Sequence, residues 1–86
     1  MQKEQLLEVM KFHLSNFNDE NAEITNDTKP GEVLSETDGF GSSNSADIFR
    51  YSMGATFKHA NVRVNVFPDN WLEMSLDELS TKLLEQ

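Results

Sequence analysis

The stretch "NVRVNVF", Asn61 to Phe67, decides between two fold classes for this chain. Its valines alternate with polar residues, a period-two pattern that is typical of a β-strand with one buried face. No second stretch of the 86 residues shows such alternation, so a strand here would have no pairing partner in the same chain. The stretch is therefore either a strand in a small α+β domain, or an extended loop or short helix in an all-α domain.

The segment after this stretch predicts a well-capped helix. Ser75-Leu76-Asp77-Glu78 is a capping box, because the Ser75 hydroxyl can accept a hydrogen bond from the backbone N–H of Glu78 while the Glu78 carboxylate reaches back. The apolar residues that follow recur at helical spacing and predict one buried face: Leu76, Leu79, Leu83 and Leu84.

A second helix is predicted before the stretch, over residues 45–58, "SADIFRYSMGATFK". Ser45 or an earlier serine is expected to be its N-cap, and Asp47 falls in its first turn, where the helix dipole favours a carboxylate. The expected apolar face consists of Ile48, Phe49, Met53 and Phe57. Gly54 lowers the stability of this helix by about 1 kcal/mol relative to alanine.

The N-terminal part predicts a third helix over residues 3–17, followed by a long polar loop. The helix has apolar residues at spacings of three and four: Leu6, Met10, Leu14 and Phe17, with Leu7 beside them. The loop, residues 18–45, exceeds the roughly 12–15 residues that structureless connections usually reach, which indicates either function or disorder. Its apolar residues are expected to hold it across the core of one domain, residues 1–86: Ile24, Val33, Leu34 and Phe40.

Composition limits the kinds of partner. Seven basic and fifteen acidic residues give a net charge of −8, which disfavours nucleic-acid and membrane-surface binding and favours basic protein partners, although acidity can also serve solubility alone. The absence of cysteine excludes disulfides, thiolate metal sites and thiol catalysis. Neither an N-terminal targeting segment nor an 18-residue apolar run is present, so we expect a cytoplasmic protein.

The sequence offers little for catalysis or for metal binding. His13 and His59 are the only histidines, and neither belongs to a recognisable catalytic or zinc-binding pattern. The acidic stretch "NFNDENAEITND" lacks the glycine and the terminal glutamate of a calcium-binding EF-hand loop. We therefore expect a protein that is not an enzyme and that has no metal site.

A cluster of serines immediately before the second predicted helix is the clearest candidate for a site. The stretch "ETDGFGSSNSADIF", Glu36 to Phe49, places Ser42, Ser43 and Ser45 at that boundary. One of these serines can cap the helix. Another can attach a phosphate-bearing group, whose charge would be favoured by the helix dipole and by free backbone N–H groups.

The order of elements and four short motifs resemble the acyl carrier protein family, including the carrier domains of polyketide and peptide synthases. The motif "GFGS", ending at Ser42, is similar to the family's "GFDS", in which the serine carries 4′-phosphopantetheine. "EITNDT" resembles the entry to the family's first long loop, "FPDN" its apolar-Pro-acidic turn, and "MSLDELSTKLL" its final helix.

The resemblance implies an all-α, four-helix bundle with a long first loop, and 4′-phosphopantetheine on a serine at the start of the second helix. Gly41 and Ser43 stand where the family usually has aspartate and leucine. A second alignment, through "NSAD", places the attachment at Ser45 instead of Ser42. A third alternative is a carrier-like protein without a prosthetic group.

The resemblance also implies a function. The chain would carry an acyl intermediate as a thioester, in fatty acid or polyketide biosynthesis, and would present it as a monomer to enzymes with basic surfaces, including a phosphopantetheinyl transferase. Asp38, Asp47 and Ile48 would contact these partners, and Ile48, Met53 and Phe57 would line a core that shelters the acyl chain. The alternative is a small acidic interaction or inhibitor-type module that binds a basic protein without a prosthetic group.

Overall fold

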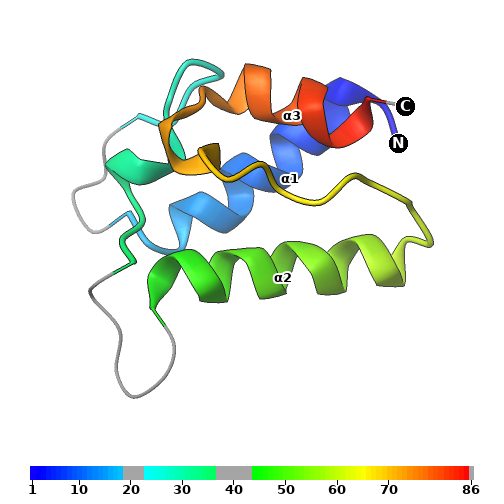
Figure 1. Cartoon of the computed structure of the whole chain (residues 1–86), viewed down its shortest axis with the longest axis horizontal. Helices are drawn as coiled ribbons and strands as arrows, with labels where there is room; N and C mark the ends of the chain where they lie inside the picture. The colour runs from blue at the N-terminus through cyan, green and yellow to red at the C-terminus, as the bar shows by residue number, and fades with distance from the viewer. Residues whose placement is uncertain (19–22, 37–43, 86) are drawn as a thin grey trace.

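The computed structural model describes residues 1–18, 23–36 and 44–85, and this part of the chain is all-α. Its α-helices are α1 (Lys3–Ser15), α2 (Ser45–His59) and α3 (Leu76–Leu84). Two short 3-10 turns accompany them, η1 (Pro30–Glu32) and η2 (Trp71–Glu73). Figure 1 shows α1 and α3 together on one side of the molecule and α2 along the other. Within the described residues, no helix combines the length and the apolar character that crossing a membrane requires.

The expected four-helix bundle is wrong, because the described residues contain three α-helices. The chain between α2 and α3 is an extended segment followed by the single turn of η2. Pro68 lies in the middle of this connection, where its missing N–H and fixed φ disfavour a continuous helix. The core is therefore made by three helices and the connecting segments that lie across them.

Helix α2 ends in a Schellman motif that turns the chain back along the molecule. Asn61 has a positive φ of 56°. The N–H of Asn61 donates to the carbonyl of Lys58 (3.1 Å), and the N–H of Val62 donates to the carbonyl of Phe57 (2.9 Å). These bonds satisfy carbonyls that the helix end leaves open.

The stretch 61–67 then runs as an extended chain beside α3, not as a strand (Figure 1). The backbone N–H of Asn65 donates to the carbonyl of Leu83 at 2.8 Å, and its side-chain amide donates to the carbonyls of Lys82 and Glu85. Val66 is 90% exposed, so the period-two pattern does not bury one face. The strand prediction is wrong for the described residues, and the extended-loop alternative is confirmed.

The core confirms most of the predicted helix faces. Its buried members from the three helices are Leu6, Leu7, Met10, Leu14, Ala46, Phe49, Met53, Phe57, Leu76, Leu79 and Leu83. Leu34 is buried, and Ile24 and Val33 pack against the same cluster, whereas Phe40 lies outside the described residues. Phe49 stacks on Trp71 with ring centroids 5.7 Å apart, and Phe67 meets both rings edge-on. These aromatic contacts fix the turn between residues 67 and 71 against the start of α2.

The first loop caps helix α3. The Ser75 hydroxyl accepts from the N–H of Glu78 at 3.1 Å, as the sequence predicts. The N–H groups of Leu76 and Asp77 donate to the carbonyls of Thr28 and Asn26, each at 2.9 Å. Segments about fifty residues apart in sequence thus satisfy the first donors of α3.

Candidate binding site at the start of helix α2

Asn44, not a serine, is the N-cap of α2. Its side-chain oxygen accepts from the N–H of Asp47 at 2.8 Å, and its side-chain amide donates to the carbonyl of Glu36 at 2.9 Å. Ser45 is the first residue of the helix itself. The expectation of a serine cap is therefore wrong, because an asparagine immediately before the helix provides the same acceptor and a second contact to the preceding loop.

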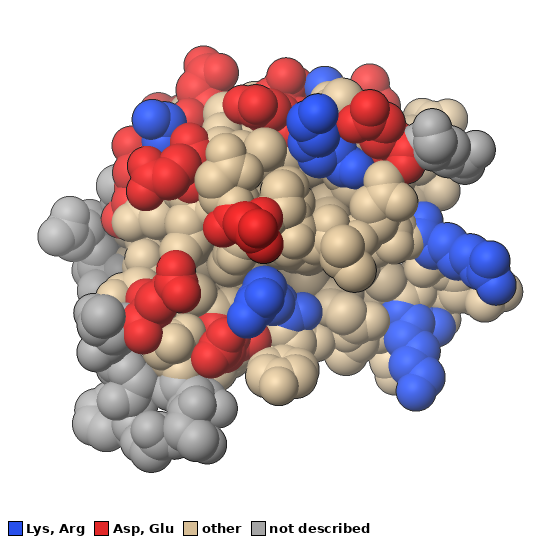
Figure 2. Space-filling model, in the orientation of Figure 1, with Lys and Arg blue, Asp and Glu red and all other residues tan. Residues whose placement is uncertain are grey.

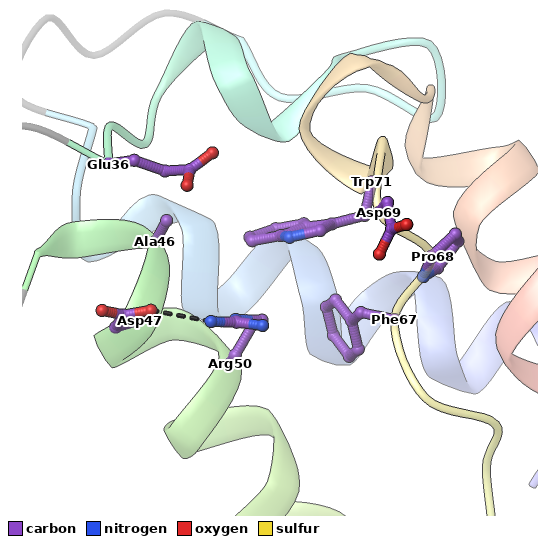
Figure 3. Close-up of a pocket in the computed structure, with 8 residues that line it drawn as sticks. All are labelled: Glu36, Ala46, Asp47, Arg50, Phe67, Pro68, Asp69 and Trp71. Atoms are coloured by element: carbon purple, nitrogen blue, oxygen red, sulfur yellow. Dashed lines mark hydrogen bonds and ion pairs between the residues drawn. The ribbon is translucent and has the colours of Figure 1, made fainter.

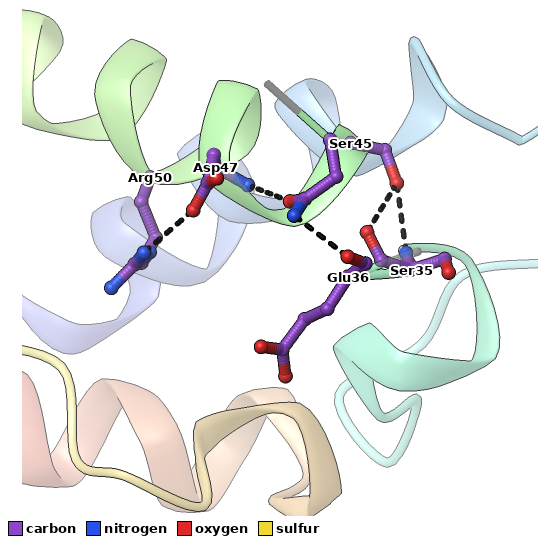
Figure 4. Close-up of polar contacts among 6 residues, drawn as sticks. Ser35, Glu36, Ser45, Asp47 and Arg50 are labelled. Carbon is purple, nitrogen blue, oxygen red and sulfur yellow. Dashed lines mark hydrogen bonds and ion pairs between the residues drawn. The ribbon is translucent and has the colours of Figure 1, made fainter. Parts of the chain in front are cut away.

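The Ser45 hydroxyl connects α2 to the loop. Its oxygen accepts from the N–H of Ser35 at 2.8 Å and its proton is donated to the carbonyl of Ser35 at 3.2 Å (Figure 4). The side chain is half-buried between the two segments. A phosphodiester on this oxygen would remove the donated bond and place a bulky charge between loop and helix, so the geometry disfavours Ser45 as the attachment point.

Two backbone donors at the start of α2 are already occupied. The N–H of Ala46 donates to the carbonyl of Ser35 at 3.2 Å, and that of Asp47 donates to Asn44. The expectation that free N–H groups of the first turn bind a phosphate is therefore wrong for these two residues. Ser42 and Asp38, the other residues expected at this site, lie outside the described residues.

The outward face of α2 exposes two large apolar side chains. Ile48 is 44% exposed and Tyr51 is 76% exposed. Ile48 therefore does not line the core as one expectation held, because each helical residue turns by about 100° and Phe49 takes the inward position. Met53 and Phe57 are buried as expected. The position of Ile48 suits contact with a partner, which stays a prediction.

A pocket with a volume of about 140 Å³ lies between the start of α2 and the turn at residues 67–71. It brings together residues from three separate segments: Glu36, Ala46, Asp47, Arg50, Phe67, Pro68, Asp69 and Trp71. Figure 3 shows Arg50 beside Asp47 on α2, with Phe67 and the Trp71 indole across from it. The guanidinium of Arg50 is paired with the Asp47 carboxylate at 2.7 Å.

Charge is distributed unevenly around this pocket. In Figure 2 acidic side chains cover the left and the top of this face, over η1, η2, the start of α2 and α3, with basic side chains among them, and further basic side chains project at the right-hand end. Lys58 and His59 occupy the last turn of α2, and Arg63 is exposed just beyond it. Around the pocket itself the carboxylates of Glu36, Asp47 and Asp69 outnumber Arg50, the single cation among the described residues that line it.

The aromatic and acidic side of this pocket was not found by the sequence argument. Asp47 was predicted as a partner-binding residue, but Glu36, Asp69 and Trp71 were not. The motif "FPDNW", with an apolar residue on each side of a rigid turn, is the one local signal for it. Nothing in the sequence pattern relates that turn to Glu36, more than thirty residues earlier.

Comparisons with protein-family models, with curated proteins and with solved structures return no match for this chain. The functional argument therefore depends on the residues and contacts at the start of α2.

Proposed function

We propose that this protein is a non-catalytic, acyl-carrier-like docking protein of the cytoplasm, in which Ser42 bears 4′-phosphopantetheine and α2 contacts the partner enzymes. The single observation that carries the proposal is the arrangement at the start of α2. A serine-rich segment leads directly into a helix with Phe49, Met53 and Phe57 on its buried face and with Ile48 and Tyr51 exposed.

This arrangement suits a carrier for a physical reason. A carrier performs no chemistry, so it needs an attachment point next to a surface that other enzymes can recognise. The exposed apolar side chains provide contact area, and the carboxylates of Glu36, Asp47 and Asp69 nearby provide steering toward basic surfaces. Contacts of this kind form and release quickly, as the repeated transfer of an acyl group between enzymes requires.

Ser42 is preferred to Ser45 on the contacts of Ser45. Both bonds of the Ser45 hydroxyl to Ser35 join α2 to the loop, and a phosphodiester on that oxygen would disrupt them. Ser42 also ends the "GFGS" motif that carries the resemblance.

The experiment is an intact-mass measurement after incubation with coenzyme A and a phosphopantetheinyl transferase of broad specificity. The wild type and Ser45→Ala should gain the mass of one phosphopantetheine group, and Ser42→Ala should not. Wild-type protein that stays unmodified, beside a known carrier modified in the same reaction, contradicts the proposal. If the modification is lost in Ser45→Ala and kept in Ser42→Ala, the attachment point is Ser45 and not Ser42.

A second candidate is an acidic interaction module that binds a basic protein without a prosthetic group. The occupied N–H groups of Ala46 and Asp47 favour it, because they remove two donors from a phosphate site at the helix start. This candidate no longer requires the α+β fold with a strand at 61–67. It predicts an unmodified protein in the mass experiment and a stable complex with a basic partner.

A further inference from the structure

The pocket at the start of α2 carries more negative than positive charge. The carboxylates of Glu36, Asp47 and Asp69 border it, and Arg50 is the one cation among its lining residues. Phe67, Pro68 and Trp71 form, together with Asp69, the wall of the pocket that faces α2 (Figure 3). The volume of about 140 Å³ is close to that of a cavity that holds a benzene molecule, roughly 150 Å³. The pocket therefore suits a group the size of one side chain.

Trp71 provides an unused hydrogen-bond donor in this wall. Trp71 is only 5% exposed, yet its indole N–H forms no hydrogen bond with the part of the chain that the structure describes. No described buried side-chain nitrogen or oxygen is sealed away without a partner, so this N–H keeps some exposure on a side chain that lines the pocket. An indole N–H only donates, so it calls for an acceptor supplied by whatever enters.

Arg50 is the cation that already pairs with one of the carboxylates lining the pocket. Its ion pair with Asp47 joins residues three apart on one helix, and the two side chains are 49% and 30% exposed. Exposed pairs of this kind are weak, so an incoming cation can compete with Arg50 for the Asp47 carboxylate. Glu36 and Asp69 form no ion pair among the described residues, which leaves their charge available.

We propose that this pocket binds an arginine side chain of a partner protein, together with a neighbouring backbone carbonyl of that partner. The guanidinium is bound by the carboxylates of Glu36 and Asp69 and lies against Phe67, and the carbonyl accepts from the Trp71 N–H. A guanidinium suits the site better than an ammonium, because its planar fork binds carboxylates in pairs and packs on aromatic rings. Arg50 opposes binding. The inference deepens the proposed function and depends on it only for the identity of the partner.

The pocket is tested directly by nuclear magnetic resonance on the ¹⁵N-labelled protein. Trp71 is the only tryptophan, so a single indole N–H signal reports on the site. The probe is the peptide acetyl-Gly-Arg-Gly-amide, and its matched control carries citrulline, the neutral isostere of arginine. The arginine peptide should shift the indole signal saturably. The citrulline peptide should bind at least about fivefold more weakly, because it loses the charge-assisted hydrogen bonds.

Variants separate the pocket from the general acidity of the protein. Asp69→Asn and Glu36→Gln should weaken binding of the arginine peptide, whereas Glu8→Gln on α1, which removes the same charge outside the pocket, should leave it unchanged. Arg50→Gln should strengthen binding about threefold, since it removes the positive charge that lines the pocket and repels the incoming guanidinium.

Equal binding of the arginine and citrulline peptides overturns the proposal. So does an equal loss in Glu8→Gln and Asp69→Asn, or weaker binding in Arg50→Gln. The indole signal is read independently of any prosthetic group. If the protein binds the arginine peptide but accepts no phosphopantetheine, the carrier function alone is refuted. If it accepts phosphopantetheine but does not bind the peptide, the arginine-binding pocket alone is refuted.

Discussion

Replacement of Ser45 by alanine measures the structural role that the geometry gives this hydroxyl. The change removes the bond accepted from the Ser35 N–H at 2.8 Å and the bond donated to the Ser35 carbonyl at 3.2 Å. A net contribution of about 0.5–1.5 kcal/mol per hydrogen bond gives a loss of roughly 1.5 kcal/mol for this half-buried pair. Alanine returns up to about 0.5 kcal/mol through its higher helix propensity. The expected net loss is therefore about 1 kcal/mol.

For a domain of this size, about 1 kcal/mol lowers the midpoint of thermal unfolding by roughly 4–8 °C. The midpoint is measured by far-UV circular dichroism and checked by Trp71 fluorescence. Ser52→Ala is the matched control, because Ser52 lies in the same helix and its hydroxyl has no partner among the described residues. The control should match or slightly exceed the wild type. Equal midpoints for Ser45→Ala and Ser52→Ala would refute the assigned role.

Substitutions at three further positions test the packing and the helix ends, each measured by the same thermal unfolding. Gly54→Ala should raise the stability by about 0.5–1 kcal/mol, because an added Cβ at this exposed helical position meets nothing within 4 Å. An unchanged midpoint would argue against a well-formed α2 at this position. Gly31→Ala should cost about 1–3 kcal/mol, because its Cβ would lie 2.8 Å from the carbonyl oxygen of Leu72; a tolerated alanine contradicts the close approach of η1 and η2. Asn61→Val should lower the stability by roughly 1–2 kcal/mol, because Asn61 has a positive φ of 56°, whereas Asn61→Gly should lower it by nothing. Equal midpoints for these two variants would exclude the left-handed conformation at the end of α2.

The helices were predictable because their signals are local. Apolar residues at spacings of three and four located α1, α2 and α3 to within two residues at each end, and the Ser75–Glu78 cap is present. The 61–67 stretch was ambiguous because its alternating valines favour a strand, whereas the absence of a second alternating stretch favours an extended loop. The extended conformation is held by Asn65, whose backbone N–H and side-chain amide donate to carbonyls at the end of α3.

The site was less predictable because its contacts join distant segments. The Ser45–Ser35 bridge spans ten residues of loop, and the pocket combines Glu36 with a turn that ends at Trp71. Sequence spacing predicted the exposed or buried side of α2 only approximately, as the outward position of Ile48 shows. Two sets of contacts that no local pattern indicates determine the site: the hydrogen bonds of Asn44 at the start of α2 and the stacking of Trp71 on Phe49.

The most direct test of the central claim is the intact mass of the protein purified from the organism that makes it, followed by mapping of the modified residue. The account predicts a population heavier than the sequence by one 4′-phosphopantetheine, free or acylated, on Ser42. A protein that consists only of unmodified chains, under conditions in which other carriers of the same cell are modified, would contradict the account.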